Sequence, residues 1–237
     1  MSLVEWPRRI AALTQLRVDD PERPVLSKDD DHHLRRVLRA NDGEEVVVTD
    51  GHGTWSICEV TAVSLNRLTP VHVDPTPTPT TLYMAPLKGD RSEWAVAKAT
   101  ELGITHIVPL LSARLAVKFK GEIRDKNMAR WQRIANEACG QCRRTYDVVI
   151  GDPVTPQQLG ADVAIADFDG DPDWSTVQAV AVGPEGGWDA DEFNPSQRRV
   201  SLGPSVLRAE TAAIVAASLI SFTNGSWGFT ASAPENR

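Results

Sequence analysis

The sequence predicts an α/β protein in two parts, a small β-rich N-terminal domain and a larger domain built on a parallel sheet. Strand-like patterns dominate the first 74 residues, and a proline-rich segment follows them. Beyond that segment, apolar strand-like runs alternate with helical patterns, which favours a parallel sheet covered by helices. The length of 237 residues allows one large domain or two modest ones.

The composition is that of an ordinary globular protein, with 41% hydrophobic and 24% charged residues. No run of about 18 apolar residues occurs, so we expect no membrane span and no membrane partner. The N-terminus has no long apolar stretch, so we expect no secretory signal. Three cysteines are typical of a reducing compartment, and we therefore expect a cytoplasmic protein.

The net charge of −7 averages over one basic segment. Residues 114–144 contain nine Lys and Arg against three Asp and Glu, whereas residues 145–237 contain four against thirteen. A basic block on an otherwise acidic protein is what an RNA-binding surface would look like. A solvated helical face would give the same pattern, and the residues leave both interpretations open.

We assign residues 1–74 to the N-terminal domain. Residues 46–49 and 55–63 have strand-like patterns, separated by a turn at Asp50-Gly51. Residues 30–39 predict a helical segment, in which Leu34, Val37 and Leu38 share one face. Three arginines lie off that face: Arg35, Arg36 and Arg39.

Residues 75–80 form a proline-rich linker, because prolines at alternate positions exclude both helix and sheet ladder. We assign residues 81–225 to the second domain and residues 226–237 to a flexible polar tail. In the second domain, buried strands are predicted at residues 82–85, 104–111, 161–166 and 177–182, and long helices at 90–102, 126–140 and 210–223. Capping boxes are predicted at Asp90 with Glu93 and, for a short helix, at Asp189 with Glu192.

Two loops that follow the later apolar runs predict a small-molecule pocket at one edge of the sheet. The first, GPEGG, spans residues 183–187, and the second, LGPSVLRAET, spans residues 202–211. Glycines there permit positive φ and close approach of the main chain to a ligand. The first loop matches neither dinucleotide-binding nor P-loop patterns, which argues against a dehydrogenase or a kinase. A purely structural turn remains the alternative.

Two motifs resemble metal or redox sites without completing one. His32-His33 has no further ligand at suitable spacing, so packing or backbone bonding is the favoured interpretation, and we assign no metal. Cys139 and Cys142 form a C-x-x-C that closes a helix, whereas a redox pair normally opens one. Beside this motif, Gln141, Arg143 and Arg144 could hold a phosphate and a base edge.

Five motifs in one order resemble the RsmE-type 16S rRNA (uracil-N3)-methyltransferases of the SPOUT superfamily. They are HHLRRVLR (32–39), KGDRSEWAVAKATELG (88–103), EACGQCRR (137–144), GPEGG (183–187) and LGPSVLRAETA (202–212). The resemblance implies a SPOUT-type knotted parallel sheet with a trefoil knot, preceded by a PUA-like β-barrel domain that helps to bind RNA. It also implies S-adenosyl-L-methionine (SAM) as cofactor, a uridine of 16S ribosomal RNA in the small ribosomal subunit as target, and a homodimer.

The resemblance places the cofactor in three loops, the first of which follows residues 161–166. The cofactor-binding residues are expected to be Ala166, Gly183, Pro184, Glu185, Gly186, Gly187, Leu202, Gly203, Leu207, Arg208 and Thr211. The RNA-binding candidates are Arg35, Arg36, Arg39, Lys88, Arg91, Gln141, Arg143 and Arg144. The catalytic candidates are Arg208, as a donor to developing charge, and Glu210, as a base or as a cap of its own helix, the capping role being favoured.

Because the cofactor carries its own electrophilic methyl group, no covalent enzyme intermediate is expected. Two other functions remain open: a SPOUT methyltransferase that acts on transfer RNA, and a non-catalytic RNA-binding or ribosome-assembly factor. Three departures from the family pattern bear on these expectations. They are the N-terminal segment 4–9 in place of an aromatic-rich strand, Ala209 in place of the usual Thr, and the acidic segment 167–171.

Overall fold

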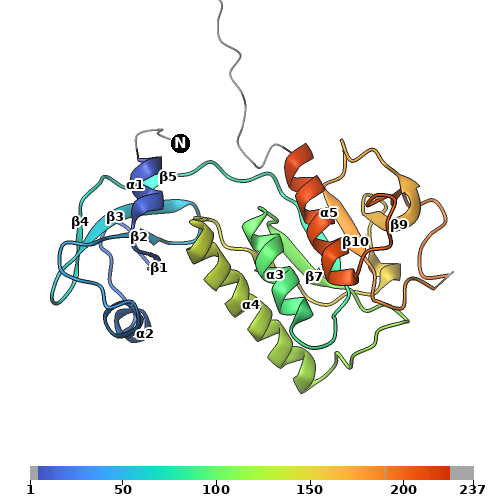
Figure 1. Ribbon diagram of the computed structural model, residues 1–237, viewed down its shortest axis with the longest axis horizontal. Coiled ribbons are helices and arrows are strands. Elements are labelled where there is room, and N and C mark those ends of the chain that lie inside the picture. The colour runs from blue at the N-terminus through green and yellow to red at the C-terminus, as the bar shows by residue number, and fades with distance from the viewer. Residues whose placement is uncertain (1–4, 190, 225–237) are drawn as a thin grey trace, which may run out of the picture. The chain divides into compact units, whose positions relative to one another are not determined.

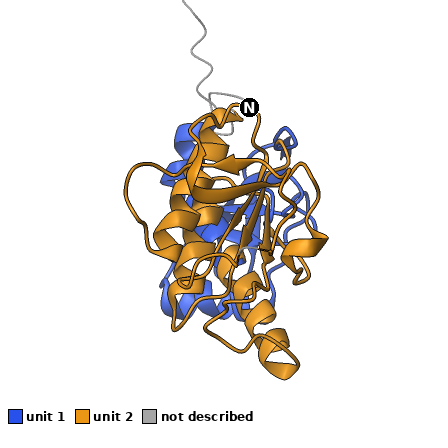
Figure 2. Cartoon of the chain, turned by 90° about the vertical axis from the view of Figure 1, so that its right-hand side faces the viewer, with its two compact units in different colours: residues 1–77, 136–147 blue, residues 78–135, 148–237 orange. Residues whose placement is uncertain are grey.

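A computed structural model describes residues 5–189 and 191–224 of the chain (Figure 1), which separates into two compact units. Unit 1 comprises Met1–Pro77 and Asn136–Asp147, and unit 2 comprises Thr78–Ala135 and Val148–Arg237 (Figure 2). The division at Pro77 falls inside the proline-rich segment. The stretch Asn136–Asp147, which the sequence places in the second domain, groups with unit 1 instead.

Unit 1 is built on a five-stranded sheet. Its path runs β1 (Gln15–Arg17), β2 (Glu45–Thr49), β3 (Thr54–Val60) and β4 (Leu65–Arg67), and β5 (His72–Val73) also pairs with β3. β1 pairs with β2 in parallel, and the other pairings are antiparallel. The predicted strands at 46–49 and 55–63 are therefore confirmed as β2 and β3, although β3 ends at Val60.

Both faces of the β2–β3 hairpin are buried. Val46 and Val48 lie in one hydrophobic cluster, which also contains Leu34, and Val47 lies in another with Trp55. Successive side chains of a strand point to opposite faces of the sheet, so a run of three valines can serve both clusters. This explains why the segment is continuously apolar rather than alternating.

The helices of unit 1 bear on two expectations, the structure of the N-terminal segment and the helical segment at residues 30–39. Helix α1 (Trp6–Ala11) overlaps the segment 4–9 that departs from the family pattern, so the first strand comes later, at β1. The predicted helical segment at 30–39 is confirmed as α2 (Lys28–His32) continued by a π-helical turn, η1 (His33–Val37). In that turn the amide of Leu38 donates to the carbonyl of His33, five residues back. The wider winding leaves Leu34 buried but Val37 60% exposed, so Val37 does not share the inward face as predicted.

Unit 2 is built on a six-stranded parallel sheet, as the alternation of strands and helices predicted. The spatial order is β11 (Arg199–Val200), β9 (Ala164–Asp171), β10 (Ala179–Val182), β6 (Thr81–Met84), β7 (His106–Pro109) and β8 (Val149–Ile150). All pairings are parallel. β10 lies between β9 and β6, so the direction of strand order reverses beside β6, which is where open parallel sheets bind ligands.

The long helices of the second domain are confirmed as α3 (Arg91–Glu101), α4 (Glu122–Cys142) and α5 (Ala209–Thr223), with a short 3-10 turn, η2 (Pro156–Gln158), between β8 and β9. α3 packs on α5, and α5 packs on β10 and β6 (Figure 1). Four alanines of α5, at 212, 213, 216 and 217, are buried and permit this close approach. α4 begins four residues before the predicted start, and Cys142 ends it.

The capping box predicted at Asp90 is wrong. The side chain of Asp90 makes no capping hydrogen bond to α3, and Glu93 pairs with Arg130 at 2.6 Å instead. Of the box predicted at Asp189, the hydrogen bond from the Asp189 amide to the Glu192 carboxylate is present, but the predicted short helix is not found among the described residues. Glu192 is buried and holds a loop, because its carboxylate accepts from the amides of Asp189 and Ala113.

Among the described residues, no helix is long and apolar enough to cross a membrane. The predicted tail, residues 226–237, lies outside the described residues.

Candidate functional site

A cavity of about 690 Å³ lies in unit 2. Its walls come from the end of β10 and the loop after it, from β9 near Ala166, from the segment between β11 and α5, and from the first turns of α3 and α5. Both glycine-bearing loops identified in the sequence therefore lie at one cavity. Its size and mixture of polar and apolar walls are those of a small-molecule site.

Most of the residues predicted to bind a cofactor line this cavity. Those that do are Ala166, Gly183, Pro184, Glu185, Gly187, Leu202, Gly203, Leu207 and Arg208. Gly186 and Thr211 lie outside the lining. A Cβ on Gly186 would meet Cβ of Arg114 at 3.2 Å, so this glycine faces a neighbouring loop rather than the cavity.

Several further lining residues were not among the predicted cofactor-binding residues. Those that carry charge or large side chains are Arg91, Asp167, Phe168, Trp188, Asp189 and Arg199. Asp167 and Phe168 continue β9 beyond its buried run, and Arg199 lies on β11, a two-residue strand without a periodic signal. Arg91 lies in the motif at residues 88–103, which is about 80 residues or more away from the glycine loops in sequence, so the sequence does not suggest contact with them.

The first glycine loop is held by an indole and by one residue of unusual backbone geometry. Trp188 packs over Gly183, where an added Cβ would lie 3.0 Å from Cε2 of the indole. The indole Nε1 donates to the carbonyl of Ala166 at 2.9 Å and thus ties this loop to β9. Gly187 has φ of 70°, a conformation that residues with a Cβ adopt only at a cost.

One rim of the cavity carries charge and an exposed aromatic ring. Arg199 forms an ion pair with Asp167. Phe168 is 60% exposed although it lines the cavity. An exposed ring at the mouth of a pocket offers a stacking surface for a planar group.

The two catalytic candidates have different surroundings. Arg208 is exposed, lines the cavity and occupies the N-cap position of α5. Glu210 is only 7% exposed and lies outside the cavity lining. Its Oε2 accepts no hydrogen bond from any described residue and lies 3.8 Å from Nη1 of Arg91. The geometry thus gives the Glu210 carboxylate an ion-pair partner on α3.

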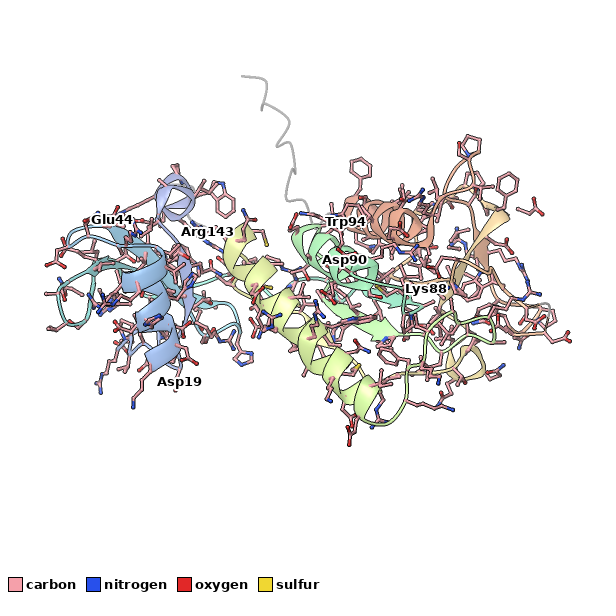
Figure 3. The ribbon with its side chains drawn as sticks, turned by 60° about the horizontal axis from the view of Figure 1, so that its bottom comes forward. Asp19, Glu44, Lys88, Asp90, Trp94 and Arg143 are labelled. Atoms are coloured by element: carbon pink, nitrogen blue, oxygen red, sulfur yellow. The ribbon has the colours of Figure 1, made fainter. Side chains whose placement is uncertain are left out.

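The RNA-binding candidates of unit 1 differ in whether their side chains are exposed or engaged by other residues. Arg36 and Arg39 are exposed, whereas Arg35 pairs with Asp31 at 2.7 Å. Gln141 is exposed at the end of α4. Arg143, labelled in Figure 3, donates to the carbonyls of Ala12 at 2.6 Å and Gly140 at 3.0 Å, and burial lowers the pKa of its guanidinium.

Arg144 is half-buried, and its carbonyl accepts from the Gln15 side chain. In unit 2, Lys88 is exposed just before α3 (Figure 3). Arg91 is the remaining candidate, and its guanidinium is engaged by two carboxylates.

The cysteine motif forms no metal centre in the described part of the chain. Within residues 5–189 and 191–224, no group of three or more His, Cys, Asp and Glu side chains could hold a metal ion. Cys139 is buried, and its thiol lies 3.8 Å from the carbonyl of Tyr146. Cys58 is also buried, and Cys142 is half-buried.

Comparison with known proteins identifies both units. The RNA methyltransferase domain family matches residues 74–221, and the RNA methyltransferase PUA domain family matches residues 26–69. The ribosomal RNA small subunit methyltransferase E of Mycobacterium bovis is 31% identical over 88% of this chain and 89% of its own length. The Bacillus subtilis protein of the same name is 27% identical over 91% and 96%, respectively.

Among solved structures, one from Legionella pneumophila in complex with the bound cofactor SAM is 28% identical, with a TM-score of 0.74. The match covers 87% of this chain and 96% of that one. The parallel sheet with its cavity is therefore an α/β RNA methyltransferase domain, preceded by a PUA-like domain. The chain as a whole belongs to the RsmE-type family of ribosomal RNA small subunit methyltransferases.

Proposed function

We propose that this enzyme transfers a methyl group from SAM to N3 of a uridine in 16S ribosomal RNA, without a covalent enzyme intermediate. The observation that carries the proposal is the cavity of about 690 Å³ at which four separate segments of the methyltransferase domain meet. The relatives named above are ribosomal RNA small subunit methyltransferases, and the Legionella structure contains SAM.

The cavity fits the parts of SAM. Apolar side chains, among them Val182, Leu202 and Leu207, suit an adenine ring. Carboxylates of Asp167 and Glu185 suit ribose hydroxyls or a cationic centre. When bound, SAM supplies a methyl group on a positively charged sulfur, and this electrophile removes any need for a protein nucleophile.

The protein's own contribution is alignment and charge. Holding two reactants in line can account for about 7–11 kcal/mol of a barrier. Loss of the N3 proton leaves negative charge on the uracil, and Arg208 is an exposed donor on the cavity wall that can stabilise it. Glu210 lies outside the cavity lining and beside Arg91, which supports a structural role for its carboxylate rather than proton transfer.

Three finer features of architecture belong to the same proposal. A trefoil knot in unit 2 is supported by the insertion of β10 between β9 and β6 and by the packing of α5 on both β10 and β6. Closure of the unit 1 sheet as a PUA-like barrel is supported by burial on both faces of β2. The homodimer is supported by exposed Trp94 on α3 and Phe222 on α5.

The proposal includes the domain limits 1–74 and 81–225, which the matched ranges 26–69 and 74–221 support. A substrate in the ribosome would also fit the cytoplasmic location expected from the low cysteine count.

The test is incubation with methyl-labelled SAM and small ribosomal subunits that lack the modification. Label at N3 of one uridine of 16S RNA is the expected result. Label confined to transfer RNA would replace the proposed substrate by the alternative. Absence of SAM binding in calorimetry would instead favour the non-catalytic assembly factor.

A further inference from the structure

The guanidinium of Arg91 connects three segments that are distant in sequence. Its Nη2 lies 2.8 Å from Oε1 of Glu185 in the first glycine loop, and its Nη1 lies 3.8 Å from Oε2 of Glu210 at the start of α5. Its Nε donates to the carbonyl of Lys88 at 3.0 Å, which fixes the side chain against the turn before α3. Each nitrogen of the guanidinium thus faces a different acceptor.

The surroundings show where this cation is needed. The Arg91 side chain is only 33% exposed, and the carboxylate of Glu210 is buried with an oxygen that accepts no hydrogen bond from any described residue. A buried carboxylate without a compensating charge is costly, so Arg91 offsets that cost for Glu210. A phosphate bound to Arg91 from outside would have to compete with both carboxylates.

We propose that Arg91 is a positioning residue of the cofactor pocket and not an RNA contact. It holds Glu185, and with it the loop of residues 183–187, at a fixed distance from the first turn of α5. Both elements supply walls of the cavity that Arg91 itself lines. The inference deepens the proposed function and rests on it, because SAM is taken as the ligand of that cavity.

The chemistry favours arginine at this position. A planar guanidinium presents several donors in a fixed fork, whereas a lysine ammonium is a point charge on a flexible stem. A glycine-rich loop that is held in place before binding loses less conformational freedom when the ligand arrives, which strengthens binding. Lysine at position 91 would keep the charge but not the simultaneous contact with two carboxylates and a carbonyl.

The experiment is a double-mutant cycle with two binding measurements on the full-length protein. Arg91→Ala, Glu185→Gln and the double variant are compared by calorimetry with SAM and by filter binding to 16S RNA without SAM. We expect each single change to weaken SAM binding about tenfold. The double variant should be little worse than either, because both changes remove the same contact. RNA affinity should stay within about twofold of the wild type.

Two further variants separate positioning from folding and from phosphate binding. Arg91→Lys should lose most of the SAM affinity although it retains the charge. Arg130→Ala removes another ion-paired arginine, the partner of Glu93, and should leave SAM affinity unchanged. If Arg91→Ala does not fold, the near-isosteric Glu185→Gln still tests the contact, with the unfolding midpoint in urea as its folding control.

The possible results separate the role of Arg91 from the proposed function. Loss of RNA affinity with SAM affinity unchanged would overturn the inference and restore Arg91 as an RNA contact. Additive losses in the double variant would also overturn it. If the wild type binds SAM and neither substitution changes the affinity, the inference alone is overturned. If the wild type does not bind SAM, the proposed function and the inference are overturned together.

Discussion

Arg9 and Asp74 form a buried ion pair in unit 1, with 2.8 Å between Nη1 and Oδ2 and with side chains that are 3% and 15% exposed. The same carboxylate accepts hydrogen bonds from the indole of Trp55 at 3.0 Å and from the hydroxyl of Thr145 at 2.7 Å. Its backbone carbonyl accepts from the hydroxyl of Tyr146 at 3.0 Å. Asp74 therefore joins α1, β3 and the segment after α4, which explains why residues 136–147 group with unit 1.

Substitution of Asp74 by alanine should destabilise unit 1 strongly. It leaves the Arg9 guanidinium buried without its carboxylate, and breaking a buried pair in this way costs about 3–5 kcal/mol. The free energy of unfolding in urea is the measurement. Lys98→Ala is the matched control, because the Lys98–Glu101 pair is partly exposed and should be worth about 1 kcal/mol or less. Equal losses for the two variants would contradict the assigned role of Asp74.

The Asp74 carboxylate should also make the free energy of unfolding depend on pH in the acidic range. Burial by itself raises the pKa of Asp74, but hydrogen bonds from Thr145 and Arg9, with the charge of Arg9, hold that pKa below its usual value of 3.8. A carboxyl with a lowered pKa in the fold stabilises it fully above the unfolded pKa, and this contribution is lost as the pH falls toward the folded pKa. Between about pH 5 and about pH 3, the wild type should lose more stability than Asp74→Asn. Parallel curves would refute this.

Gly170 should tolerate no side chain, because β9 and β11 approach each other there. A Cβ at this position would lie 2.2 Å from the carbonyl carbon of Val200, a backbone atom that cannot rotate away. We expect Gly170→Ala to cost more than about 3 kcal/mol of unfolding free energy, at the upper end of overpacking effects. Gly187→Ala separates crowding from backbone strain. Its Cβ would meet nothing within 4 Å, so only the φ of 70° opposes it, at about 1–2 kcal/mol.

Ala212→Leu should block the cofactor cavity from the α5 side. Ala212 is buried and lines the cavity, so the larger side chain extends into space that a ligand would use. SAM affinity by calorimetry should fall about tenfold or more, equivalent to about 1.4 kcal/mol. Ala129→Leu makes the same change at an exposed position of α4 and should leave the affinity unchanged. Wild-type affinity in the Ala212 variant would show that the ligand lies elsewhere.

The basic residues of unit 1 should separate into structural and RNA-contacting groups. Arg143→Ala removes hydrogen bonds to two backbone carbonyls and should cost about 2 kcal/mol of stability. Exposed Arg36 should be neutral for stability, within about 0.5 kcal/mol on replacement by alanine. Its loss should reduce the slope of log affinity for RNA against log salt by about one. An unchanged slope would remove Arg36 from the RNA surface.

The fold class, the existence of the pocket and the family all follow from the amino-acid sequence alone. Buried parallel strands such as β6 and β10 are short apolar runs, and this local pattern survives in any tertiary context. Glycines at 183, 187 and 203 also carry a local signal, since two of them have positive φ in the structure. The order of the five motifs along the chain indicated the family.

Which groups far apart in the chain come into contact depends on the three-dimensional fold. The pairing of Arg91 with Glu185, the insertion of β10 between β9 and β6, and the attachment of residues 136–147 to unit 1 all depend on contacts between segments far apart in the chain. Local errors had the same origin: Asp90 leaves the helix end uncapped, and Glu93 binds Arg130 of another helix. Periodicity records whether a residue is buried, but the partner of a buried charge is set by packing over long range.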